Sequence, residues 1–315
     1  MNSCSTPCDA STLVPHSRRP GSEPDRRLAA LVQLLGDESD FVWQRIRPEF
    51  TRAGRSATSH LRRAALSTDA RARSRARTLL AELDRAAVVR RLAGYATREK
   101  LDLETALFLL ARYRDPALDP RPFQRALDSM AAELVERGRR TQDELERVRL
   151  IPRYLGIELG FGGSAGDFHN PDNVHLHRVV EKRTGMPLSL CAIYLFVAKR
   201  MGLRGGILPL PGHVMLRIWA GPTGIIFDPY HKGQERTERE CRRYVEQNRM
   251  RFEPGMLREA SERVLFKRQL VNLTRSAEKR GMKREIDDFA LVLHALEARA
   301  AAAARGAGPA LGPRI

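Results

Sequence analysis

The sequence predicts an α+β protein that is mostly helical, with one buried helix packed on a small sheet. Residues 186–201 are apolar on almost every side, which indicates a helix without a solvent-facing surface. Residues 214–219 and 225–227 are β-branched and aromatic runs on either side of a Gly/Pro turn, a pattern typical of an antiparallel hairpin. Elsewhere apolar residues recur at helical spacing. We therefore expect helical segments on both sides of this α+β centre.

Composition excludes several classes of protein. The chain has 315 residues, of which 42% are hydrophobic and 30% charged, so it can bury a sizeable core. Collagen-like, disulfide-scaffold and wholly disordered classes do not fit these values. The longest uncharged runs, 184–198 and 205–216, are shorter than the roughly 20 residues that a membrane-spanning helix needs. We expect no membrane association.

Cysteine usage and the N-terminal residues favour a cytoplasmic location. The first 30 residues contain no apolar run, so they do not resemble a secretory signal. Of the four cysteines, Cys4 and Cys8 fall in a Ser/Thr/Pro-rich stretch, and Cys191 and Cys241 stand far apart from them and from each other. This spacing does not require disulfides, which agrees with a reducing compartment.

The net charge of +17 raises the question of nucleic-acid binding. It comes from 55 Lys and Arg residues against 38 Asp and Glu residues, but aromatic residues make up only 6% of the chain. Single-strand binding needs basic residues interleaved with exposed aromatics, and no reading motif is present. The charge therefore predicts at most a non-specific attraction for polyanions.

Periodicity and turn residues divide the chain into five segments. We expect disordered tails at 1–25 and 306–315, a helical segment at 26–100, an α+β core at 101–250 and a helical hairpin at 251–305. Within these segments, helices are predicted at 40–51, 58–66, 71–83 and 145–155, a flexible loop at 160–163, and a helix pair at 265–276 and 287–304.

Three residues in the predicted core have side chains suited to nucleophilic catalysis. Cys191 lies near the start of the buried helix, where the helix dipole favours a thiolate. His213 precedes one predicted strand and Asp228 ends the next, so a hairpin would place them side by side. In such a set the thiol attacks, the imidazole transfers the proton and the carboxylate orients the imidazole.

At these residues the sequence resembles a known family. The motifs are Asn170-Pro171-Asp172-Asn173, the stretches 179–190 and 198–203, Leu210-Pro211-Gly212-His213 and Phe227-Asp228-Pro229. Together they resemble the transglutaminase-like core of the bacterial SirB-type family over residues 102–247. In the same way, residues 34–83 resemble HEAT-type helical repeats, and the helix pair resembles a tetratricopeptide unit.

The resemblance implies a papain/transglutaminase-like fold with a Cys-His-Asp triad. His213 and Asp228 match the histidine and aspartate of that triad. In active relatives the nucleophile stands at the very start of the buried helix, where this chain has Pro187, Leu188 and Ser189. Cys191 lies a little further inside the helix, so the chain departs from the family pattern at the nucleophile.

Two functions therefore remain open, and a basic polyanion-binding protein is a third alternative that rests on the net charge alone. One is a catalytically inactive core that serves as a protein-binding module, with a protein or peptide partner. The other is an active cysteine hydrolase or acyl-transferase that uses Cys191, His213 and Asp228 on a protein or peptide amide. A free cysteine in an apolar helix is more often a small buried residue than a nucleophile, which favours the first.

The sequence predicts neither a cofactor nor a metal site. His169, His175 and His177 lie close together along the chain, but His175 and His177 are two residues apart and would diverge on a helix. No cysteine pair has the spacing of a zinc finger. Nucleotide-binding glycine motifs are absent as well.

Overall fold

A computed structural model describes residues 23–164 and 166–306 of the chain, and the side chains up to residue 302. Most of the two predicted tails, including Cys4 and Cys8, lies outside the described residues. The chain divides into two compact units, Met1–Asp84 and Arg85–Ile315. The division falls inside one long helix, and the boundary that we predict at residue 100 stays a prediction.

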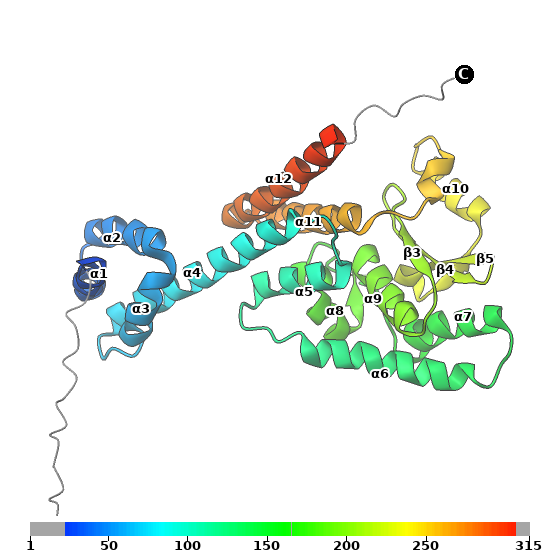
Figure 1. Cartoon of the computed structure of the whole chain (residues 1–315), viewed down its shortest axis with the longest axis horizontal. Coiled ribbons are helices and arrows are strands. Elements are labelled where there is room, and N and C mark those ends of the chain that lie inside the picture. The colour runs from blue at the N-terminus through cyan, green and yellow to red at the C-terminus, as the bar shows by residue number, and fades with distance from the viewer. Residues whose placement is uncertain (1–22, 165, 307–315) are drawn as a thin grey trace, which may run out of the picture. The chain divides into compact units, whose positions relative to one another are not determined.

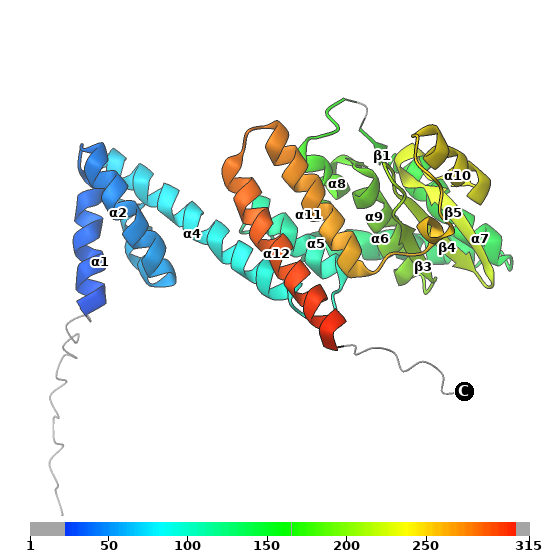
Figure 2. The same ribbon diagram turned by 90° about the horizontal axis from the view of Figure 1, so that it is seen from above.

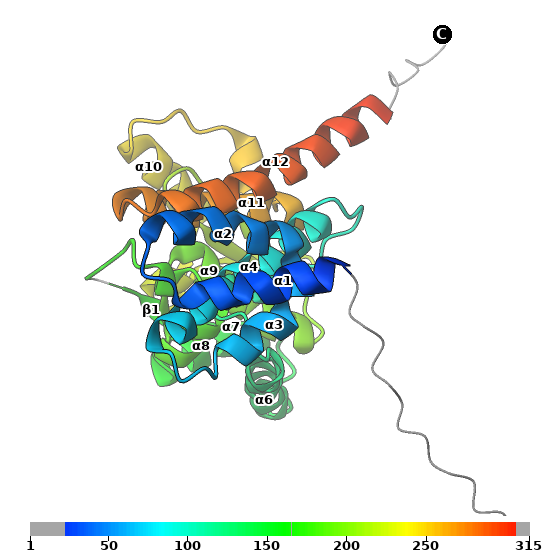
Figure 3. The same ribbon diagram turned by 90° about the vertical axis from the view of Figure 1, so that its left-hand side faces the viewer.

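The first unit is a small helical cluster. Its core contains Leu35, Phe50, Leu61 and Leu79, none of them more than 1% exposed, and Figure 3 shows its helices from their own side. The helical segments are α1 (Glu23–Gln33), a 3₁₀ turn (Leu34–Gly36), α2 (Asp40–Ala53), a second 3₁₀ turn (Gly54–Ala57), α3 (Thr58–Ala64) and the first part of α4 (Ala70–Ala96). The predicted end of a helix at residue 83 was wrong, because no glycine or proline interrupts α4 before Gly94.

The second unit holds the helices and sheets of the core. Figure 1 shows its helices gathered around a small sheet. Its helices are α5 (Leu103–Arg114), α6 (Arg121–Gly138), α7 (Glu144–Pro152), a π-helical turn (Arg153–Glu158), α8 (Leu176–Lys182), α9 (Pro187–Arg200), α10 (Glu238–Gln247), α11 (Glu262–Lys279) and α12 (Lys283–Gly306). The 3₁₀ turns are η4 (Pro171–Asn173), η5 (Pro229–His231) and η6 (Pro254–Leu257). The strands are β1 (Gly162–Gly163), β2 (Thr184–Gly185), β3 (Gly205–Leu208), β4 (Met215–Ala220), β5 (Thr223–Asp228) and β6 (Gln234–Arg236).

The main sheet is covered by a helix on each face. Its strands run in the order β3-β4-β5-β6 and all neighbours are antiparallel, which confirms the predicted hairpin as β4 and β5. Successive side chains of a strand point to opposite faces of the sheet. Leu216 and Phe227 lie in the hydrophobic core that contains α9, whereas Met215 and Ile226 pack against α10 on the other face. The protein is thus a mostly helical α+β fold.

The helix α9 is the centre of the second unit. Its residues 187–198 are all buried, as the apolar run predicts. Gly202 ends the helix with a φ of +76°, a conformation that glycine adopts without strain. The helix carries both the predicted nucleophile and the residues that precede it, so its placement decides how the candidate site is built.

The C-terminal helix pair, α11 and α12, packs on this core. The turn between the helices contains Gly281 with a φ of +67°. Glu262 at the start of α11 accepts hydrogen bonds from the backbone N–H of Leu103 (2.9 Å) and from Lys199 of α9 (2.8 Å). Figure 2 shows α11 beside α5 and α9, with α12 along its outer side.

Two further sequence expectations need correction. Gly162 and Gly163 form a short parallel pair with Thr184 and Gly185, so residues 160–163 are not simply a flexible loop. Strand β4 begins at Met215 rather than at residue 214, so Val214 lies with His213 in the loop before the strand. None of the described helices combines the length and the apolar character needed to cross a membrane.

Candidate functional site

The start of α9 is held by the Asn170–Asn173 motif. Asn170 accepts a hydrogen bond from the backbone N–H of Asp172 (2.9 Å), which forms the 3₁₀ turn η4. The carbonyl of Asn173 then accepts from the N–H of Met186 at 2.8 Å. Pro187 follows as the first residue of α9, where the missing N–H of proline costs nothing.

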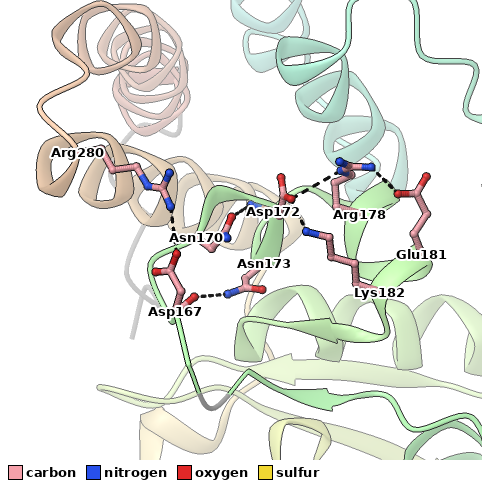
Figure 4. A network of polar contacts seen from close by, with 8 residues as sticks. All are labelled: Asp167, Asn170, Asp172, Asn173, Arg178, Glu181, Lys182 and Arg280. Carbon is pink, nitrogen blue, oxygen red and sulfur yellow. Dashed lines mark hydrogen bonds and ion pairs between the residues drawn. The ribbon is translucent and has the colours of Figure 1, made fainter.

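Ion pairs fasten the same motif to the neighbouring helices, as Figure 4 shows. Asp172 contacts Lys182 and Arg178 of α8, and Arg280 near the end of α11 pairs with Asp167 at 3.2 Å. Asn173 donates to the carbonyl of Asp167 at 2.7 Å. The Asn170–Asn173 motif therefore has a structural role, because it determines where α9 begins.

The loop that carries His213 is held from the other side by Arg268 of α11. The guanidinium donates to the carbonyl oxygens of Pro209 (2.8 Å) and Leu210 (3.2 Å). Gly212 adopts a φ of +77°, which a side chain would strain. These contacts bring the imidazole of His213 to the end of strand β5, with only 7% of the residue exposed.

The structure brings His213 and Asp228 together. Nε2 of His213 lies 2.9 Å from Oδ1 of Asp228, the last residue of β5. The antiparallel pairing of Leu216 with Phe227 explains this contact, because it places the start of β4 beside the end of β5. Asp228 is 1% exposed.

A second histidine, which the sequence analysis missed, contacts the same carboxylate. Nδ1 of His231 lies 2.7 Å from Oδ2 of Asp228, and the backbone N–H of His231 donates to Oδ1 at 3.3 Å. Pro229 starts the 3₁₀ turn η5 that folds His231 back onto Asp228. The Asp-Pro-x-His spacing was the available signal, because such a turn brings residues three apart together.

The carboxyl of Asp228 stays ionised despite its burial. Burial alone would raise the pKa of Asp228, but the hydrogen bonds and charges of His213 and His231 outweigh it, so the pKa is lowered from its ordinary value. Arg236 adds a further positive charge, with Nη2 at 3.8 Å from Oδ2.

A cavity of about 540 Å³ opens beside this cluster. Pro187 lines it together with His213, and the rings of Tyr230 and Tyr244 form aromatic walls with centroids 5.9 and 5.4 Å from that of His213. Tyr230 is held by a hydrogen bond to the carbonyl of Ser164 (3.1 Å) and lies so close to Gly163 that a Cβ there would overlap its ring.

Cys191 does not face this cavity. It lies four residues after Pro187, about one helical turn further along α9. Its thiol is fully buried and donates to the carbonyl of Val214 at 3.5 Å, and within the described residues no hydrogen bond joins it to His213. Burial, and to a smaller extent the charge of Asp228, raise the pKa of Cys191 well above its ordinary value.

Ser189, the other hydroxyl or thiol near the helix start, has a structural environment. Its Oγ donates to the carbonyl of Val174 (3.1 Å) and accepts from Gln269 of α11 (2.7 Å). Ser189 is thus part of the contact between α9 and α11.

Among the described residues, His175 and His177 are both buried, with Nδ1 atoms that have no hydrogen-bond partner.

The comparisons with known proteins agree with this architecture. A model of the transglutaminase-like superfamily matches residues 121–271, a range that contains Pro187, Cys191 and the whole cavity cluster of His213, Asp228 and His231. A curated UPF0162 protein of Xylella fastidiosa (strain 9a5c) is 30% identical over 151 residues, which cover 47% of this chain and 52% of that protein.

Other relatives match a shorter part of the chain. The F-box only protein 21 of Mus musculus is 32% identical over 99 residues, 29% of this chain and 16% of the relative. A UPF0162 protein of Vibrio cholerae is 25% identical over 91 residues, 29% of this chain and 34% of that protein. The chain spans about half the length of the UPF0162 proteins from Xylella fastidiosa, and no solved structure matches it significantly. Residues 121–271 therefore contain a transglutaminase-like domain.

Proposed function

We propose that this domain is a protein- or peptide-binding module without cysteine catalysis. The observation that carries the proposal is the start of α9, where Pro187 lines the cavity beside His213 and offers no nucleophile. A nucleophile must lie within hydrogen-bond reach of its general base. The thiol of Cys191 instead bonds a backbone carbonyl, and its raised pKa keeps it protonated near neutral pH.

The cavity has the features of a site for a peptide side chain. Phe168, Tyr230 and Tyr244 supply apolar and aromatic surface, and Arg236 and Arg243 stand at the same cavity as polar partners. Binding sites commonly combine apolar walls with a few placed polar groups. A peptide that inserts an apolar or aromatic side chain between the two tyrosines, with a polar group toward the arginines, would satisfy this arrangement.

The finer family assignment belongs to the same proposal. We propose the SirB subtype because five motifs occur in the order that this type shows. The helix pair α11 and α12 supports the tetratricopeptide-like assignment of residues 251–305, and the cluster α1–α3 supports the HEAT-like one. A cytoplasmic location also stays a prediction, as does non-specific attraction for polyanions from the +17 charge.

A synthetic peptide array, followed by fluorescence anisotropy on the peptides that bind, tests the binding function. We expect saturable binding to the full chain that falls at least tenfold in Tyr244→Leu and in Arg243→Gln. Phe41→Ala serves as the control, since Phe41 is 68% exposed and lies in the first unit. Thermal unfolding of each variant checks that it folds.

Two results would contradict this proposal. One is the absence of saturable peptide binding, or binding that the cavity variants leave unchanged. The other is hydrolysis of the peptides, or their coupling to an added amine, that disappears in Cys191→Ser. The second result would establish the alternative function, a cysteine hydrolase or acyl-transferase.

A further inference from the structure

We propose that His213, Asp228 and His231 bind one divalent transition-metal ion of the zinc type. One donor atom from each of these residues lies within 4.8 Å of the others, and no other such group of three forms among the described residues. The donors come from three separate places: the loop before β4, the end of β5 and the turn η5. This inference goes beyond the proposed peptide binding and does not rest on it.

The spacing of the donor atoms is close to that of a coordinated ion. Nε2 of His213 is 2.9 Å from one oxygen of Asp228, and Nδ1 of His231 is 2.7 Å from the other. Bonds of 2.0–2.1 Å in a tetrahedral site would set ligand atoms about 3.3 Å apart. An outward shift of a few tenths of an ångström at each histidine would bring these two spacings to that value, and the ligand atoms of the two histidines lie within 4.8 Å of each other. The side chain of His231 is 56% exposed, so it has space to move.

The donor types indicate which ion fits. Two imidazoles and one carboxylate suit zinc or ferrous iron, whereas calcium and magnesium prefer oxygen ligands. The cluster lies at the wall of the 540 Å³ cavity, so further coordination positions would face open space. Three protein ligands with an open position are typical of a reactive metal site rather than a structural one.

The proposed ion would change the role of His213. The same Nε2 atom cannot contact the carboxylate through a hydrogen bond and also coordinate a metal with its lone pair. The ion would therefore replace the hydrogen bonds between Asp228 and the two rings. Arg236 would oppose it, because its guanidinium lies 3.8 Å from Oδ2 of Asp228, and its contact to Glu240 is no shorter (3.9 Å).

Titration of the full chain with zinc chloride and cobalt chloride tests the proposal. All proteins compared carry Cys4→Ser and Cys8→Ser, so that these thiols do not contribute. We expect one ion per chain by calorimetry and a visible absorption band from bound cobalt. His231→Gln should weaken binding at least tenfold, and this exposed side chain is replaceable without loss of the fold. His294→Gln, at an exposed position of α12, is the matched control and should bind like the parent.

A third variant tests the role of charge. Arg236→Met removes the positive charge beside Asp228 and should tighten metal binding. Arg236→Gln and Arg236→Met should both weaken the binding of a peptide that contacts this arginine. Absence of saturable binding, or equal affinity in the parent and in His231→Gln, would overturn the metal site. Weaker metal binding in Arg236→Met would also contradict coordination of the ion by Asp228. Peptide binding measured with a chelator present reports separately on the proposed function.

Discussion

Two groups of histidines in this domain differ in their hydrogen-bond partners and in their access to open space. The cavity cluster, His213 and His231 with Asp228 between them, has short contacts to one carboxylate and lies beside open space. The interior pair, His175 and His177, is buried, with rings 6.0 Å apart and Nδ1 atoms that have no hydrogen-bond partner in the part of the chain that the structure describes. The pair that is close in sequence does not make a site, whereas the residues that a hairpin and a turn bring together do.

The electrostatics of the two groups differ in the same way. In the cavity cluster, two imidazoles stabilise the charge of Asp228 against its burial. In the interior pair, burial lowers the pKa of His175 to about 3, and the neighbouring His177 adds to the effect. The cavity cluster thus keeps the negative charge of Asp228 inside the protein, whereas the interior pair keeps His175 neutral.

Among the variants that test this comparison, removal of the Asp228 carboxylate should change the free energy of unfolding most. Asp228→Ala leaves both histidines and the N–H of His231 without their common acceptor, and the loss of a buried, paired group costs about 3 kcal/mol of unfolding free energy. Urea denaturation measures it. Asp167→Ala, which breaks an exposed pair with Arg280, is the control and should cost less than about 1 kcal/mol. Equal losses in the two variants would contradict a central role for Asp228.

The interior pair should make stability depend on pH. The pKa of His175 is about 3 in the folded protein, below its ordinary 6.5, so the unfolded chain binds the extra proton between these values. The free energy of unfolding should therefore fall as the pH falls from about 6.5 to 3, by up to about 1.4 kcal/mol per pH unit from this group. His175→Leu should reduce that slope in urea denaturation at several pH values, and His294→Leu should leave it unchanged.

A smaller effect is expected at the turn before His213. Gly212 has a φ of +77°, and a Cβ there would lie 3.4 Å from the hydroxyl of Tyr244, so Gly212→Ala should cost about 1 kcal/mol. Gly255→Ala is the matched control, because its Cβ would meet nothing within 4 Å and its φ is not positive. A cost at Gly255 as large as that at Gly212 would show that backbone strain is not the cause.

The fold was predictable where hydrophobic pattern alone decides it. The apolar run around Leu190 and the hairpin at β4 and β5 both follow from residue type and spacing. The length of α4 was not predicted, because its weakly amphipathic sequence, which has no glycine or proline before Gly94, does not mark an end at residue 83. The short pairing of β1 with β2 was also missed, since two glycines have no side chains from which to judge a strand.

The candidate site was predictable only in part. The proximity of His213 and Asp228 followed from the hairpin, because the two residues flank it. The direction in which Cys191 points did not, since a helix in contact with neighbours on every side gives no periodicity that distinguishes one face from another. His231 was missed because its contact depends on a single 3₁₀ turn.

The central claim is that Cys191 does not supply the cavity of this transglutaminase-like domain with a catalytically active thiol. The direct test is the rate at which iodoacetamide labels Cys191 in the native chain between pH 5 and pH 8, followed by peptide mass spectrometry. We predict that Cys191 stays unlabelled until the chain is unfolded, because the sulfur is buried and its pKa is raised. Rapid labelling of Cys191 below neutral pH that is lost in His213→Gln would contradict the account.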